Sequence, residues 1–68
     1  MQVPIELDSL VRRVREEFRE MPGLRLTPEQ AGRLWGLERE TCRAVIDRLV
    51  EDAFLRWTRT GSVGRFDT

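Results

Sequence analysis

The chain has 68 residues and a formal net charge of zero, because twelve basic residues balance twelve acidic ones. A chain of this length forms one domain with a thin core, and it has no room for a deep substrate cavity. Histidine, lysine and tyrosine are absent, and neither Ser9 nor Ser62 has an evident catalytic base. No glycine-rich phosphate loop occurs. We therefore expect neither an enzyme nor a cofactor.

Cys42 is the only cysteine of the chain. An internal disulfide is therefore excluded, and a single cysteine without histidine cannot form a zinc site. The position of Cys42 in an apolar helical pattern predicts a small core residue rather than a reactive thiol. No apolar run is long enough to span a membrane, and the N-terminus lacks the features of a signal peptide. We expect a cytoplasmic protein without a membrane, metal or small-molecule partner.

The first predicted element is an amphipathic helix. Its apolar residues recur at spacings of three and four, which is the period of one helix face. They are Leu7, Leu10, Val11, Val14, Phe18 and Met21. Asp8 or Ser9 is expected to cap the N-terminus of this helix, and Pro22-Gly23 is expected to end it.

The residues before this helix, 1–6, are predicted to be flexible or bound to a partner. Val3 and Ile5 are apolar, and a domain this small has few apolar residues to spare. Together with Leu7 they are candidates for pairing with a second copy of the chain.

A second helix is predicted over residues 28–35. Thr27 can cap it, Pro28 occupies its first position, and Gln30 can complete a capping box. Gly36 is expected to end the helix after two turns. The residues expected on its buried side are Ala31, Leu34 and Trp35.

A third helix is predicted over residues 38–52. Its expected buried residues are Leu37, Cys42, Val45, Ile46 and Leu49. Helical geometry then places an acidic stripe on the opposite face, formed by Glu40, Ala44, Asp47 and Glu51. Arg43 with Asp47, and Arg48 with Asp52, have the spacing of ion pairs along a helix.

The last part of the chain changes to the period of a β-strand. Apolar and polar residues alternate over 55–58, a turn signal occupies 59–62, and 63–66 can return antiparallel. The alternation over 24–26 also predicts a very short strand. Trp57 is expected to be more exposed than Trp35, which packs in the core. From Ala53 to Phe66 there are three arginines and no acidic residue.

The order of these elements resembles the winged helix-turn-helix family of bacterial DNA-binding domains. The segment 26–37, LTPEQAGRLWGL, is similar to the second helix of that family and its tight turn. Residues 41–57 are similar to the third helix and the entry to the wing, and residues 61–66 to its tip and return strand. The resemblance covers residues 7–66. It implies a mainly α fold with a little β, a single domain over 1–68, and a wing of two or three strands.

The resemblance also implies a set of contacts with double-stranded DNA. In this family the third helix usually enters the major groove, and the wing lies along the backbone or minor groove. Carried over by position, the third-helix candidates are Arg39, Glu40, Thr41 and Arg43, and the wing candidates are Arg56, Arg59 and Arg65. Arg25 and Arg33 are secondary candidates for backbone contacts.

Two functions remain open from the sequence. The first is a DNA-binding module of a transcriptional regulator, acting as a dimer or within a larger protein. The second is a winged-helix module that binds protein, because the acidic stripe is unusual for a helix that reads a groove. A continuous arginine surface from Arg39 and Arg43 to Arg56 and Arg59 favours DNA. Arginines held by Glu40, Asp47 or Asp52 favour protein.

Overall fold

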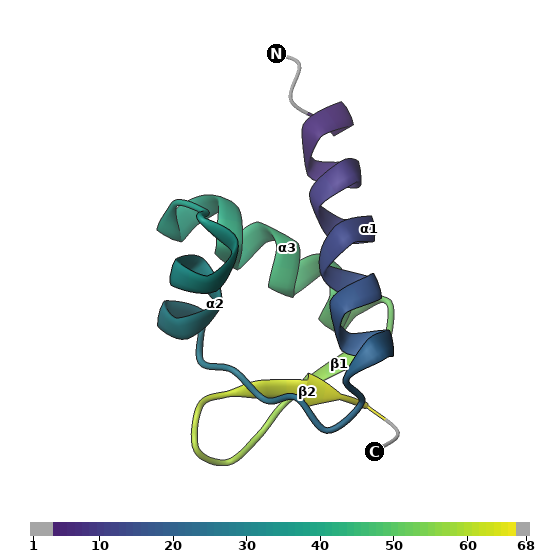
Figure 1. Cartoon of the computed structure of the whole chain (residues 1–68), viewed down its shortest axis with the longest axis vertical. Helices are drawn as coiled ribbons and strands as arrows, with labels where there is room; N and C mark the ends of the chain where they lie inside the picture. Colours follow the sequence, from purple (N-terminus) through teal and green to yellow (C-terminus); the bar gives the residue numbers. More distant parts are fainter. Residues whose placement is uncertain (1–3, 67–68) are drawn as a thin grey trace.

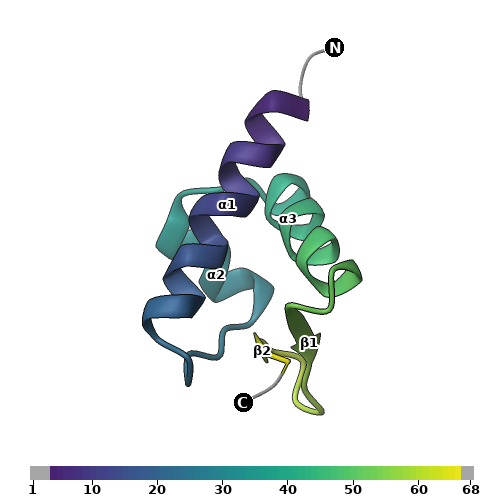
Figure 2. The same ribbon diagram turned by 90° about the vertical axis from the view of Figure 1, so that its right-hand side faces the viewer.

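The computed structural model describes residues 4–66. Within this range the chain forms three α-helices followed by a two-stranded antiparallel sheet (Figure 1). The elements are α1 (Pro4–Glu20), α2 (Pro28–Trp35), α3 (Arg39–Glu51), β1 (Leu55–Trp57) and β2 (Val63–Arg65). The mainly helical fold with a small β part is as predicted. The hairpin lies at the opposite end of the molecule from the start of α1 (Figures 1 and 2).

Helix α1 begins earlier than predicted. It starts at Pro4, so Asp8 and Ser9 lie inside the helix and cap nothing. Proline suits the first helical turn, because its missing N–H has no partner there and its fixed φ is helical. Residues 4–6, which were predicted to precede the helix, form its first turn, and their pairing with a partner stays a prediction. Residues 1–3, including Val3, lie outside the described residues.

The core lies between the three helices and one face of the hairpin. Its buried hydrophobic residues are Val11, Val14, Phe18, Ala31, Trp35, Cys42, Val45, Ile46, Leu49, Leu55 and Val63. Phe18 meets Trp35 edge to face, with 6.1 Å between the ring centroids. Leu7, Leu10 and Leu37, all predicted on buried faces, are partly buried against this core.

Two predicted core residues are exposed instead. Met21 is 46% exposed because it follows the last residue of α1 and begins the turn through Pro22. Leu34 is 58% exposed. Helix α2 has only eight residues, and it contacts the core along the single row formed by Ala31 and Trp35. Leu34 lies beside that row and faces outward.

Both ends of α2 are closed as predicted. The Thr27 hydroxyl accepts a hydrogen bond from the Gln30 N–H at 3.1 Å, and the Gln30 side chain accepts one from the Thr27 N–H at 3.0 Å. This capping box pairs two backbone N–H groups that the helix itself leaves free. At the other end Gly36 adopts φ 66°, which glycine reaches without the strain of a Cβ.

Helix α3 ends in a Schellman motif with an unusual residue. The Ala53 N–H donates to the Val50 carbonyl, and the Phe54 N–H donates to the Leu49 carbonyl, both at 3.0 Å. Ala53 lies at φ 61°, in the left-handed region that glycine normally occupies at this position. The turn is needed because it directs the chain from α3 straight into β1.

We therefore expect Ala53→Gly to stabilise the chain. The left-handed conformation costs an L-residue about 1–2 kcal/mol. The greater freedom of glycine in the unfolded chain offsets roughly 0.4–1 kcal/mol of that gain. Urea denaturation should show a rise of about 0.5–1 kcal/mol in the free energy of unfolding. A fall would contradict the left-handed assignment. The matched control is Gly36→Ala, which should destabilise by a similar amount.

The hairpin has a single register. Leu55 pairs with Arg65, Arg56 with Gly64, and Trp57 with Val63. The strand predicted over 24–26 is reduced to one bridge, in which Leu26 and Val63 exchange two backbone hydrogen bonds of 2.8 and 3.1 Å. Strand β2 therefore lies between β1 and the segment that leads into α2. In the part of the chain that the structure describes, no helix has the length and apolar character needed to cross a bilayer.

Candidate functional site

The tip of the hairpin is organised by the Thr58 hydroxyl. This hydroxyl accepts from the Ser62 N–H at 3.2 Å and shares hydrogen bonds with the Ser62 and Thr60 hydroxyls at 2.7 and 3.1 Å. The Thr58 N–H donates to the Ser62 carbonyl at 2.7 Å. A turn with this many internal partners holds a defined shape. It carries Arg59, which is exposed.

A row of three residues crosses the outer face of the hairpin. Gly64 faces Arg56 on β1, and the Leu26–Val63 bridge places Arg25 on its other side. Residues that pair across strands share a face, so Arg25, Gly64 and Arg56 lie on one face. A Cβ on Gly64 would lie 3.1 Å from Arg25 Cγ and 3.6 Å from Arg25 Nε. The Arg25 side chain therefore lies across β2, over the glycine.

The row belongs to a hollow of about 310 Å³ on the hairpin. The residues that line it are Arg25, Arg56, Trp57, Thr58, Arg59, Gly64 and Arg65. Of these described lining residues, four are arginines and none is acidic. Arg65 also packs on the Phe54 ring, with its guanidinium carbon 5.0 Å from the ring centroid. Trp57 is 40% exposed, against 8% for Trp35, as predicted for the two tryptophans.

A second, larger hollow lies between the start of α2 and the start of α3. Its volume is about 700 Å³, and it is lined by Thr27, Pro28, Glu29, Gly32, Arg33, Leu37, Arg39 and Arg43. Three arginines and one carboxylate meet there. Leu37 of this lining packs against the core, and the Cys42 thiol donates to the carbonyl of the lining residue Pro28. This hollow shares no lining residue with the hollow on the hairpin.

The exposed face of α3 is acidic, as predicted. Glu40, Asp47 and Glu51 are exposed, and Ala44 between them is half-buried. Arg43 Nε lies 3.7 Å from Asp47 Oδ1, which confirms the predicted pair. Both side chains are more than half exposed, so solvent screens the pair and its stabilising effect is small.

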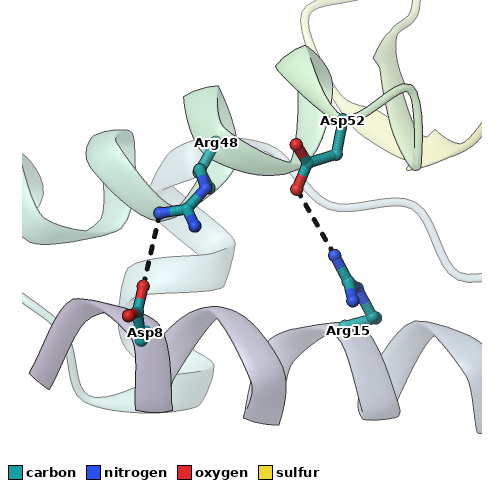
Figure 3. A network of polar contacts seen from close by, with 4 residues as sticks. All are labelled: Asp8, Arg15, Arg48 and Asp52. Atoms are coloured by element: carbon teal, nitrogen blue, oxygen red, sulfur yellow. Dashed lines mark hydrogen bonds and ion pairs between the residues drawn. The ribbon is translucent and has the colours of Figure 1, made fainter. Parts of the chain in front are cut away.

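The second ion pair predicted along α3 is wrong. Arg48 does not contact Asp52; Arg48 Nη1 lies 3.4 Å from Asp8 Oδ1, and Arg15 Nη2 lies 3.4 Å from Asp52 Oδ2 (Figure 3). Both pairs join α1 to α3. The two helices pack side by side, so the carboxylates of the neighbouring helix come within reach of arginines that could otherwise pair along their own helix. All four side chains are at least about a third exposed, so solvent screens these pairs and their effect on stability is small.

The predicted contact residues thus fall into two groups. Arg56, Arg59 and Arg65 meet at the hairpin hollow with Arg25, while Arg39 and Arg43 meet Arg33 at the α2–α3 hollow. Glu40 and Thr41, the other two residues of α3 that were predicted to contact DNA, line neither hollow. Thr41 is half-buried.

Sequence reasoning missed the placement of Arg25 and the role of Gly64. A glycine inside a short strand is a signal that another group approaches the backbone closely. That signal alone could have pointed to Gly64, but not to Arg25.

Cys42 is buried, as predicted. It is 1% exposed, and its Sγ lies 3.6 Å from the Pro28 carbonyl oxygen. Burial removes water from the thiol, which disfavours the thiolate and raises the pKa of Cys42 above its ordinary value of 9.0. The thiol therefore stays protonated and unreactive in the folded chain.

We expect an alkylating reagent at about pH 8 to modify Cys42 at least about 100-fold more slowly in the folded chain than in urea. Because folding raises the pKa, the thiol contributes stability that is complete below the unfolded pKa of 9.0 and is lost as the pH rises through the folded value. Equal rates in the folded and unfolded chains would contradict the buried position. Mass spectrometry of timed samples gives both rates.

The comparisons with known proteins add no family to this description. No family model, no curated protein and no solved structure matches the chain.

Proposed function

We propose that the chain is a DNA-binding domain of the winged helix-turn-helix type, with α2 and α3 as the helix-turn-helix and the hairpin as the wing. The observation that carries the proposal is the hairpin hollow, which is lined by four arginines and by no carboxylate of the described residues 4–66. Arginine guanidinium groups bind phosphate oxygens in a bidentate manner, and phosphate contacts supply most of the affinity for DNA. In this proposal the hairpin binds the backbone, and α3 approaches the major groove through Arg39 and Arg43.

The zero net charge is compatible with this proposal because the charges are unevenly distributed. Among the described residues, the ion pairs join arginines and carboxylates of the helices: Arg15–Asp52, Arg19–Glu16, Arg43–Asp47 and Arg48–Asp8. In that same part of the chain, Arg25, Arg56 and Arg59 take part in no ion pair. The helices neutralise much of their own charge, and Arg25, Arg56 and Arg59 remain available to an anion.

The test is the affinity for a short DNA duplex measured at several salt concentrations. If three to four arginines each neutralise one phosphate, the logarithm of the affinity should fall with a slope of about −3 against the logarithm of the salt concentration. The double variant Arg56→Ala/Arg59→Ala should lower the affinity about 10- to 100-fold and reduce the slope by about 2.

Arg12→Ala/Arg13→Ala is the matched control. It removes the same charge from the exposed side of α1, away from the hairpin, and it should change the affinity no more than about threefold. If the chain does not bind the duplex even at low salt, the DNA-binding proposal is wrong. Equal losses in the two double variants would show that net charge, and not the hairpin, determines binding.

The acidic stripe of α3 favours a second candidate, a winged-helix module that binds a protein. Glu40, Asp47 and Glu51 are exposed on one face, and Arg43 is held by Asp47. A basic surface of a partner protein would complement that stripe. Under this alternative, the variants of the hairpin arginines leave binding to the partner unchanged, and neutralising the stripe abolishes it.

In the proposed function, the domain acts as a dimer or as part of a larger regulator. Few phosphates are within reach of one copy of so small a domain, and a second copy doubles the contacts. Sedimentation at several protein concentrations checks this point. A monomer at the highest concentration, with and without DNA, excludes the dimer.

A further inference from the structure

Two cations, Arg25 and Arg56, flank Gly64 on one face of the hairpin. Cα atoms two strands apart are separated by roughly 10 Å, and an arginine side chain spans much of that distance. Arg25 does not extend away from its neighbour. It lies across β2, so that its Nε is 3.6 Å from the position of a Gly64 Cβ. Arg25 and Arg56 line the same hollow.

Two guanidinium groups repel each other, and an anion that lies between them attracts both and offsets this repulsion. Among the described residues no carboxylate pairs with Arg25 or Arg56, and none lines the hollow around them. The chemistry that fits this arrangement is a tetrahedral oxyanion with several acceptor oxygens, and a phosphate group is the common example.

We propose that Arg25 and Arg56 bind one phosphate group together above β2, and that Gly64 is a positioning residue for Arg25. A side chain at position 64 would occupy the space through which Arg25 crosses the strand, since a Cβ would lie 3.1 Å from Arg25 Cγ and 3.3 Å from the Leu24 carbonyl oxygen. This inference rests on the proposed function, because it names the phosphate subsite within the surface that binds DNA.

The experiment is an NMR titration of the labelled chain with inorganic phosphate, with chloride at the same ionic strength as the reference. Saturable shifts are expected for the Gly64 amide and for the Nε–H signals of Arg25 and Arg56. Gly64→Ala and Arg25→Ala should each weaken the binding of phosphate about tenfold. Arg12→Ala, which removes the same charge from α1, should leave it within about twofold.

One further variant separates positioning from charge, and the spectrum of Gly64→Ala separates positioning from folding. Arg25→Lys keeps the charge but loses the planar fork, so it should restore only part of the affinity for phosphate. If Gly64→Ala does not give the dispersed spectrum of a folded chain, the Arg25 variants decide, because Arg25 is exposed and outside the core. Equal effects of Arg25→Ala and Arg12→Ala would overturn the proposal, as would shifts spread evenly over the arginines.

A parallel titration with a short duplex, made with and without terminal phosphates, distinguishes the source of the phosphate. Equal affinities for the two duplexes assign the subsite to backbone diesters, and tighter binding of the phosphorylated one assigns it to terminal groups. If the chain binds DNA and Gly64→Ala binds it equally well, the subsite is wrong and the proposed function stands. If phosphate binds at the row but no duplex binds, the subsite stands and the proposed function fails.

Discussion

Replacing Ile46 with alanine is expected to lower the free energy of unfolding by about 3–4 kcal/mol. Ile46 is fully buried in the middle of α3, where it contacts the core formed by all three helices. The substitution removes apolar contacts and leaves a cavity, because close-packed neighbours relax only in part. A core in a chain this small supplies only about 3–5 kcal/mol. The variant should therefore be substantially unfolded at room temperature.

Urea denaturation followed by far-ultraviolet circular dichroism checks this result. Leu34→Ala is the control, because sequence periodicity predicts Leu34 in the core and the structure places it 58% exposed. Its free energy of unfolding should change by no more than about 0.5 kcal/mol. Similar losses in the two variants would contradict the orientation of α2. A small loss for Ile46→Ala would contradict the core itself.

The second large effect concerns the acidic stripe of α3. If α3 lies at the major groove, then Glu40, Asp47 and Glu51 face phosphates and oppose binding. The triple variant Glu40→Gln/Asp47→Asn/Glu51→Gln should therefore bind duplex DNA roughly 10- to 30-fold more tightly than the natural chain. The fold should be retained, because all three side chains are exposed and the Asp47–Arg43 pair contributes little to stability.

The matched control neutralises three carboxylates on α1: Glu16→Gln/Glu17→Gln/Glu20→Gln. It changes the net charge equally but on another helix, so the gain in affinity should stay within about threefold at moderate salt. Equal gains in the two triple variants would show that only net charge matters. No gain in either would place α3 away from the DNA and would favour the protein-binding alternative.

Local signals in the sequence predicted the local parts of the structure. The capping box of Thr27 and Gln30 and the left-handed Gly36 each depend on neighbours a few residues apart. The hairpin and its turn follow from alternation and composition within one stretch of twelve residues. Each of these features depends on the conformational preferences and hydrogen bonds of residues that are close in the chain. The sequence was therefore enough to predict them.

What the sequence could not predict depends on contacts between distant segments. Arg48 has two carboxylates in reach, and only the packing of α1 on α3 decides that it pairs with Asp8 rather than Asp52. The same holds for Arg25, which reaches the hairpin hollow because one backbone bridge at Leu26 places it beside β2. Periodicity also assigned Leu34 to the buried face, because a two-turn helix gives too few positions to locate its stripe.

The most direct test of the proposed DNA binding is whether a duplex perturbs the hairpin and the start of α3. In an NMR titration of the labelled chain with a short duplex, the largest amide shifts should fall at Arg25 and across residues 56–65, with a second group at residues 39–43. The exposed side of α1, around Arg12 and Arg13, should change little. Shifts centred on α1, or no shift in the hairpin at saturating duplex, would contradict the account.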